Sequence, residues 1–532
     1  KMMHTSYMPK GKDFNVSAGV GSPIYEKLRE LRCPFYIDRF QGGCALPRRY
    51  RFDPDLIGSY KAMLGDNFWG WQAHEWASNY RSDVKRIFEL YKKLGVPSPT
   101  AKERKAIWEK IKSGEEKLFL EALAPEEWAA GREPQNRAMF IDDICRLYSM
   151  ISEMTDSKLI PADSYQMAPR IEIENGAKLL LPEIGWQIPN MRIQLAYTRG
   201  MARAAKIRWG VYYECWCHNS AVGSLTYPFS LREGQDEWFE DQLTRGSGSD
   251  RSPKEREQGG TSRNLQERAW RFAYLSGATV IGEEYGVSNT FRDYKDLDLS
   301  PYGKTKREFL RFTERFTDVG EPFTPIAVVL PEALPVLNVD LPEDYLGYPS
   351  TDVSDGADSK IWQNIRAVLP LIFGKRGKLG NNAHVLTPGG LPDAFDILHE
   401  GDETALGRYQ YFIDLTGGVK FAKTHRVITP EEADDILTRL LPFRLEGEVH
   451  TLYRKTADGW LVFASNNDGV LCDNFKGDVR LGEAFLTSRI DYRSSGASCR
   501  ILDGSGVLKR DDAGDFLELR AGDWVLLGVS EA

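Results

Sequence analysis

Over the first 320 residues, short apolar runs alternate with longer stretches of helical periodicity. This alternation is typical of βα units that build a parallel sheet. The pattern predicts strands at 13–19, 34–40, 67–74, 158–164, 178–184, 207–215 and 278–284. Seven strands are one short of a (β/α)8 barrel, and the apolar segment 324–328 is a candidate for the eighth.

Helices are expected between these strands. Asn190 is suited to cap a helix over 190–206, and Gly277 is suited to end a helix over 265–276. The long segment 99–157 has helical periodicity and mixed charge, which indicates a helical insertion. The segment 217–263 is rich in Gly, Ser and charged residues and is expected to form a lid or a binding loop.

The pattern changes twice after residue 322. Apolar runs at 325–330, 384–386 and 411–415 alternate with helices at 359–369 and after Thr429, which opens a capping box. Short alternating strands then follow at 449–453, 460–463, 516–519 and 524–527. The sequence therefore predicts an α/β protein with a (β/α)8 TIM-like barrel at 1–322, a small flavodoxin-like α/β domain at 323–445 and a C-terminal β-sandwich at 446–532.

Composition narrows the classes of partner. The net charge is −8 and basic residues are interspersed with acids, so a nucleic-acid partner is not expected. No apolar run approaches the roughly 18 residues that span a bilayer, so we expect a soluble chain without a membrane partner. The seven cysteines are odd in number and scattered, which argues against a disulfide framework. Because the chain begins with Lys1, removal of a leader and hence a cytoplasmic, periplasmic or secreted location all stay open.

Aromatic residues point to a class of ligand. The chain has 13 Trp and 23 Tyr, and several follow predicted strands. Flat amphipathic rings bind the apolar faces of sugars, while neighbouring polar groups bind the hydroxyls. Any single ring is more often part of a core, but the positions after strands favour a carbohydrate ligand.

Carboxylates end several predicted strands: Glu183, Glu214, and the adjacent pair Glu283 and Glu284. Hydrolysis of a glycosidic bond requires two carboxyl groups on either side of the anomeric carbon. Side chains alternate along a strand, so only one of Glu283 and Glu284 is expected to face the reacting atom. Glu183 lies between apolar neighbours, which suits a general acid with a raised pKa.

A second polar cluster spans 68–83, from within the strand at 67–74 to the residues after it, and includes Trp71, His74 and Glu75. Asp163 ends the next predicted strand. A His–Glu pair that caps the next helix is an equally weighted interpretation. Cys215, Cys217 and His218 resemble part of a metal site, but the spacing is short for zinc and a fourth ligand is absent.

The sequence Glu284-Tyr285-Gly286 is similar to the end of strand seven in clan A glycoside hydrolases, where a catalytic glutamate precedes an aromatic residue and a glycine. The domain order resembles that of family 42 β-galactosidases. The resemblance implies that Glu284 is the nucleophile and that 325–330 opens a domain that mediates trimerisation in that family, hence a homo-oligomer. The clan's Asn-Glu pair at the end of strand four is absent, which indicates a divergent family.

We therefore expect a glycoside hydrolase, exo-acting, with retention of configuration favoured, and with no metal or other cofactor. The catalytic candidates are Glu183, Glu284 and Glu283. The candidate substrate-binding residues are Trp71, His74, Glu75, Asp163, Trp186, Tyr213, Glu214, Trp216 and Tyr285. Two alternatives stay open: a carbohydrate-binding protein on a degenerate barrel, and a metal-dependent hydrolase or isomerase that uses His74, Glu75, Asp163 and His218.

Overall fold

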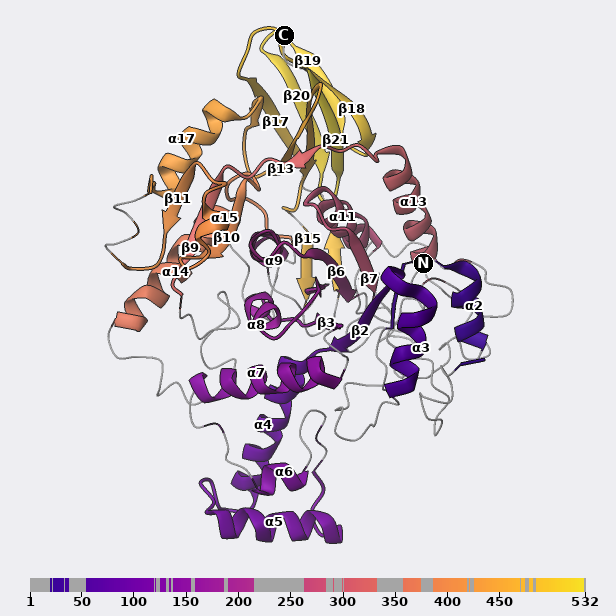
Figure 1. Cartoon of the computed structure of the whole chain (residues 1–532). Helices are drawn as coiled ribbons and strands as arrows, with labels where there is room; N and C mark the ends of the chain where they lie inside the picture. The colour runs from indigo at the N-terminus through magenta and orange to yellow at the C-terminus, as the bar shows by residue number, and fades with distance from the viewer. Residues whose placement is uncertain are drawn as a thin grey trace. The chain divides into compact units, whose positions relative to one another are not determined.

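The computed structural model in Figure 1 divides the chain into two compact units, Lys1–Pro182 with Pro335–Asp358 and Glu183–Leu334 with Ser359–Ala532. The residues that it describes are 20–21, 23–32, 34–37, 54–118, 120, 125–130, 134, 137–154, 158–185, 190–214, 263–283, 290, 299, 301–332, 357–374, 386–418, 421, 425–468, 470–473, 478–481 and 485–530. The predicted strand at 13–19 and nearly all of the segment 217–263 lie outside these residues. The boundaries of the three predicted domains stay predictions.

The first unit combines a short parallel sheet with a large helical layer. Its elements are α2 (Pro23–Leu31), β1 (Phe35–Ile37), α3 (Pro54–Leu64), the 3-10 helix η2 (Gly65–Asn67), β2 (Phe68–His74), α4 (Trp76–Lys93), α5 (Ala101–Ser113), α6 (Pro125–Ala130), α7 (Arg137–Met154), β3 (Leu159–Ala162), α8 (Ala168–Glu174) and β4 (Leu179–Leu180). Three predicted strands are confirmed here as β1, β2 and β3. The predicted helical insertion is confirmed as α5, α6 and α7.

The sheet of the first unit has the strand order β1-β2-β3 and is parallel. The strand β4 runs beside β3, because Lys178 N donates to Leu159 O at 3.4 Å and Leu181 N donates to Pro161 O at 3.3 Å. Helices α4 and α7 separate β2 from β3 in the chain, and their apolar faces join one buried cluster that includes Tyr80, Phe140 and Ile144. This helical layer holds the main core of the unit.

The second unit contains two parallel sheets, which are followed by antiparallel sheets. Its elements are β5 (Glu183–Gly185), α9 (Met191–Ala205), β6 (Arg208–Glu214), α11 (Arg263–Leu275), β7 (Val280–Glu283), α13 (Pro301–Arg315), β8 (Glu321–Pro322), β9 (Ile326–Leu330), α14 (Ala357–Phe373), β10 (Phe395–His399), α15 (Glu403–Leu406), β11 (Tyr411–Asp414), α17 (Pro430–Leu440), β12 (Phe443–Leu445), β13 (His450–Thr456), β14 (Gly459–Ser465), β15 (Val470–Asp473), β16 (Asp478–Leu481), β17 (Phe485–Tyr492), β18 (Ser498–Gly504), β19 (Val507–Asp511), β20 (Gly514–Arg520) and β21 (Trp524–Ser530).

The first sheet of this unit joins β5, β6 and β7 in parallel, with α9 and α11 as the connecting helices. Both helix ends that the sequence predicts are confirmed. Asn190 accepts the Ile193 N–H at 3.4 Å at the start of α9. Gly277 follows α11 with a φ of 103°, a backbone conformation that favours glycine.

The second sheet is parallel with the order β10-β9-β11 and belongs to the small α/β region. This order matches that of the first three strands of a flavodoxin-like sheet. The placement of β9 corrects one expectation, because residues 326–330 pair with β10 and β11 and do not extend the β5-β6-β7 sheet. The capping box at Thr429 is confirmed, since Thr429 and Glu432 each accept the other's backbone N–H.

Antiparallel sheets form the C-terminal region, as the alternating pattern predicts. One sheet has the order β12-β17-β20-β19 and another β18-β21-β14-β13-β8, and β15 pairs with β16 in a separate two-stranded sheet. The ring of Phe443 on β12 contacts the ring of Tyr453 on β13 at 5.7 Å, and the Tyr453 hydroxyl donates to Phe443 O at 3.0 Å. These contacts join the two sheets.

All sheets that the described residues form are open, so the fold is a mixture of helices and several sheets. The closed (β/α)8 barrel is not seen, and it stays a prediction. Within the described residues no helix is both long and apolar enough to cross a membrane.

Helix α9 packs against β10, where the two backbones approach closely and buried ion pairs form. A Cβ atom at Gly200 would lie 2.3 Å from Ile397 O. Nearby, Arg199 Nε donates to Asp396 Oδ1 at 2.5 Å, and Arg192 Nε donates to both oxygens of Asp393 at 3.1 and 3.2 Å. The glycine therefore permits the approach, and the arginines fix it.

We expect Gly200→Ala to lower the free energy of unfolding by about 1–3 kcal/mol, because the added methyl group overpacks against β10. Gly58→Ala is the matched control. Gly58 is exposed within α3, and an added methyl group would meet no atom within 4 Å, so this change should stabilise by about 0.5–1 kcal/mol. Urea unfolding of both variants measures the difference in stability. A Gly200→Ala variant as stable as the wild type would contradict the close packing of α9 against β10.

Candidate active site

Three acids are brought to one edge of the β5-β6-β7 sheet. Glu183 pairs with Tyr212, Gly185 pairs with Glu214, and Tyr213 pairs with Glu283. The carboxyl ends of parallel strands meet at the same edge, which is where α/β enzymes build their sites. Glu214 and Glu283 end β6 and β7, and Glu183 lies two residues before the end of β5, so the three acids are close to this edge.

The register divides these acids between the two faces of the sheet. Residues paired across parallel strands lie on the same face, and faces alternate along each strand. Glu183 pairs with Tyr212, which is two residues before Glu214, so Glu183 and Glu214 belong to one face. Glu283 pairs with Tyr213 and belongs to the other face.

Glu283 is fixed by side chains from two helices. Its carboxylate forms an ion pair with Lys306 of α13 and accepts a hydrogen bond from Gln266 Nε2 of α11 at 3.3 Å. The side chain is buried, with 7% of its surface exposed. These contacts show that its face is the helix-covered one.

Glu183 is also buried, with 1% exposed. Its backbone oxygen accepts a hydrogen bond from Gln194 Nε2 of α9 at 2.8 Å. This hydrogen bond links Glu183 to the helix that follows it, so the position of Glu183 depends on how α9 packs.

Tyr213 lies on the face of Glu283 and packs against α11. It is fully buried and its ring meets Trp270 of α11 edge-on, with centroids 5.9 Å apart. This placement makes it a core residue between sheet and helix, and its role in substrate binding stays a prediction.

In the first unit, Trp71 is likewise a core residue. It is fully buried and contacts Tyr60 and Phe68 edge-on, at 6.0 and 5.5 Å. The next residue on β2, Gln72, belongs to the opposite face, and both polar atoms of its buried amide are without a hydrogen-bond partner. Buried amides are normally satisfied, so this one is suited to a water or a polar ligand. Sequence reasoning missed it because an isolated Gln carries no pattern.

Glu75 forms the turn from β2 into α4, and Asp163, which follows β3, stabilises it. Glu75 has a left-handed φ of 49°, and its N–H donates to Ala162 O at 2.7 Å. Asp163 Oδ2 accepts the Ala77 N–H at 2.7 Å and the Tyr148 hydroxyl at 3.3 Å. The carboxylate of Asp163 thus anchors the start of α4, and a role in substrate binding stays a prediction.

A buried acid that the sequence did not single out lies beside Asp163. Desolvation raises the pKa of Glu172 well above its usual value, and repulsion by Asp163 raises it further, whereas a hydrogen bond from Tyr148 lowers it. Oxygen Oε2 of Glu172 is buried without a partner. The signal was weak because Glu172 is one of several acids on a short helix.

Several predicted site residues lie outside the described part of the chain. These are Glu284, Tyr285, Trp186, Trp216, Cys215, Cys217 and His218, together with the side chains of His74 and Glu214. Within the described residues, no group of three His, Cys, Asp or Glu side chains is arranged to hold a metal ion.

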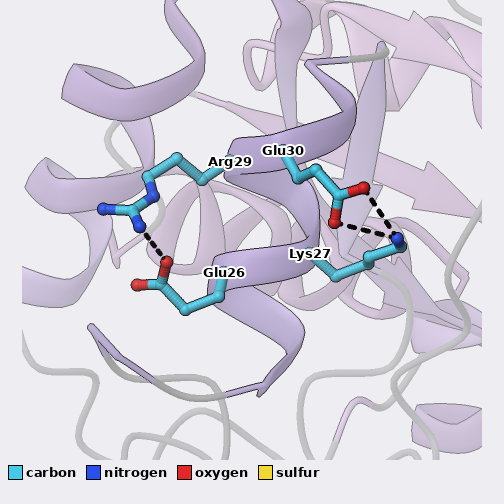
Figure 2. Close-up of a pocket in the computed structure, with 4 residues that line it drawn as sticks. All are labelled: Glu26, Lys27, Arg29 and Glu30. Carbon is cyan, nitrogen blue, oxygen red and sulfur yellow. Dashed lines mark hydrogen bonds and ion pairs between the residues drawn. The ribbon is translucent and has the colours of Figure 1, made fainter.

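Figure 2 shows a surface hollow on α2 lined by Glu26, Lys27, Arg29 and Glu30. Lys27 pairs with Glu30 at 2.9 Å, and Arg29 pairs with Glu26. These are exposed pairs one helical turn apart, which is common on solvated helices and contributes little to stability. The hollow therefore adds no functional group to the site.

Comparison with known proteins yields little similarity. No family model matches the chain, and no curated protein matches it. A solved structure of the alpha-fucosidase of Thermotoga maritima, in complex with a mechanism-based inhibitor, aligns over 86% of this chain and 94% of that one, with 12% identity and a TM-score of 0.18. A TM-score this low carries no argument about fold or function.

The raised pKa of Glu172 makes stability depend on pH. In the unfolded chain a glutamate has a pKa of about 4.3, and below this pH the protonated Glu172 contributes its full stability. The contribution is lost as pH rises through the raised pKa of the folded state. Glu172→Gln keeps the shape and removes the charge, so we expect the variant to gain stability over the wild type as pH rises.

The matched control is Glu174→Gln on the same helix, because Glu174 is exposed and pairs with Arg170 at 2.9 Å. It should follow the wild-type pH profile. Thermal unfolding between about pH 4 and about pH 9, a range that starts near the unfolded pKa of a glutamate, measures both. Parallel profiles for wild type and Glu172→Gln would show that Glu172 is ionised when folded.

Proposed function

We propose that the chain is a glycoside hydrolase whose acids act at the carboxyl edge of the β5-β6-β7 sheet. The observation that carries the proposal is the register, which brings Glu183 and Glu214 to one face of adjacent parallel strands. The (β/α)8 barrel expected from the sequence is part of the proposal.

The spacing of these acids suits glycosidic chemistry. Adjacent strands lie about 4.8 Å apart and residues on one face repeat about every 6.6 Å, so the backbones of Glu183 and Glu214 are about 8 Å apart. Side chains of this length can bring their carboxyl groups to about 5 Å or hold them wider. Both the separation of retaining enzymes and the wider one of inverting enzymes are accessible.

In the proposed mechanism Glu284 attacks the anomeric carbon while Glu183 donates a proton to the departing oxygen. Glu183 then removes a proton from water, which attacks the same carbon and releases Glu284. Glu283, held by Lys306 and Gln266, orients the strand end. Glu214 shares the face of Glu183 and is the next candidate for the second carboxylate.

Aromatic residues follow the same strands along the sequence. Trp186 comes directly after β5, and Trp216 and Tyr285 each come two residues after β6 and β7. Rings at this edge would stack on the apolar face of a sugar. This pattern favours an exo-acting enzyme on an oligosaccharide or a glycoconjugate, without a metal.

We expect hydrolysis of at least one aryl glycoside, with the anomer of the first product read by proton NMR. Glu284→Gln should abolish turnover, and Glu183→Gln should reduce it by about 10²- to 10⁴-fold. The loss for Glu183→Gln should be much smaller with a dinitrophenyl leaving group, which needs no proton. This difference separates the general acid from the nucleophile.

Glu314→Gln is the control, because Glu314 is an exposed acid on α13. It should keep wild-type rates. Full turnover by Glu284→Gln would transfer the nucleophile role to Glu214 or Glu283, which the corresponding Gln variants would then test. Glycan binding without release of reducing sugar would favour a carbohydrate-binding protein instead.

A further inference from the structure

Arg268 on α11 is a buried cation without a carboxylate partner. Its exposed fraction is 1%. Nε donates to Asn264 Oδ1 at 2.9 Å and Nη1 donates to Asn467 Oδ1, so both acceptors are neutral amides. The third nitrogen, Nη2, is buried with no hydrogen-bond partner. A buried charge in this condition is costly unless something neutralises it.

Three other buried arginines of the same unit are fully engaged, whereas a fourth, Arg271, also has a buried Nε without an acceptor but pairs with Glu267. Arg192 meets Asp393 and two backbone carbonyls, and Arg199 meets Asp396 at 2.5 Å. Arg454 has no carboxylate within the described residues, but each of its three nitrogens donates to a backbone carbonyl. Arg268 differs from all three because one of its nitrogens has no acceptor.

The hydrogen bonds of Arg268 continue into a network of buried side chains that has excess positive charge. Asn467 Nδ2 lies 3.3 Å from His450 Nδ1, and His450 Nε2 contacts Asp393, which also binds Arg192. Desolvation lowers the pKa of His450, so the ring is neutral at neutral pH. This buried network of side chains therefore contains two guanidinium groups and one carboxylate.

No nearby acid restores the balance within the described residues. Glu267 precedes Arg268 on α11, but it is partly exposed and pairs with Arg271 at 3.3 Å. Burial lowers the pKa of Arg268 to about 10, which leaves the group protonated at neutral pH. Tyr213 is the other group that acts on this charge.

We propose that Arg268 Nη2 binds a small monovalent inorganic anion of the chloride type. One negative charge balances the excess positive charge of this network, and a spherical ion needs few directed donors. Sulfate or phosphate would require several donors, whereas Arg268 has one nitrogen left to offer. The site lies between α11 and the residues that follow β14, and the bound anion would hold them together.

The test is thermal unfolding in sodium chloride or bromide against sodium gluconate at equal ionic strength. Wild type should show a saturable rise of the unfolding midpoint with chloride and bromide, since a ligand that binds only the folded state stabilises it. Arg268→Met and Arg268→Lys should lose this rise. No glycoside is involved, so the outcome is independent of the proposed function.

Arg271→Met is the matched control on the same helix, because Arg271 lies over the rings of Trp524 and Phe312 at 4.3 and 5.1 Å. It should lower the midpoint yet keep the halide dependence. Crystals of the wild-type chain grown with bromide should show an anomalous peak within hydrogen-bond distance of Nη2. Equal midpoints in chloride and gluconate, or a bromide-free Nη2, would mean that water satisfies this nitrogen and would overturn the proposal, even if the variants fail to fold.

Discussion

The second unit depends on buried ion pairs between α9 and β10. Arg199 and Arg203 both bind Asp396, and Arg192 binds Asp393. Burial raises the pKa of Asp396, but the two arginines outweigh it and hold the pKa below its usual value. Removing one partner of such a pair leaves an uncompensated buried charge, at a cost of about 3–5 kcal/mol. This constraint fixes one relative placement of a helix from the βα region and a strand from the small α/β region.

The same helix also fixes the candidate active site. Gln194 of α9 donates to the backbone oxygen of Glu183, so a shift of α9 would move the acid-bearing strand end. On the opposite face of the sheet, Lys306 and Gln266 hold Glu283. Catalytic groups require placement to within about 0.5 Å, and rigid neighbours of this kind supply it. The geometry at the sheet edge is therefore coupled to contacts far along the chain.

Sequence reasoning succeeded where local rules dominate and failed where pairing partners decide. The caps at Asn190 and Thr429 and the strands β2, β3 and β6 follow from side-chain chemistry and periodicity. The predicted strand at 178–184 is instead divided into β4 and β5, because Pro182 has no N–H for a sheet hydrogen bond. The segment 384–386 was expected as a strand, but Leu386 lies in a bend, and residues 384–385 are outside the described part.

By itself, the sequence determined most strands of the βα region and the acids near their ends, because both depend on residues close together in the chain. Only the tertiary structure identified β10, because its second residue, Asp396, is a charged group that a buried strand accepts only when Arg199 and Arg203 neutralise it. It also assigned β9 to the β10-β9-β11 sheet and separated Glu283 from the face of Glu183. Pairing register and charge compensation join residues far apart in the chain, so no local pattern contains them.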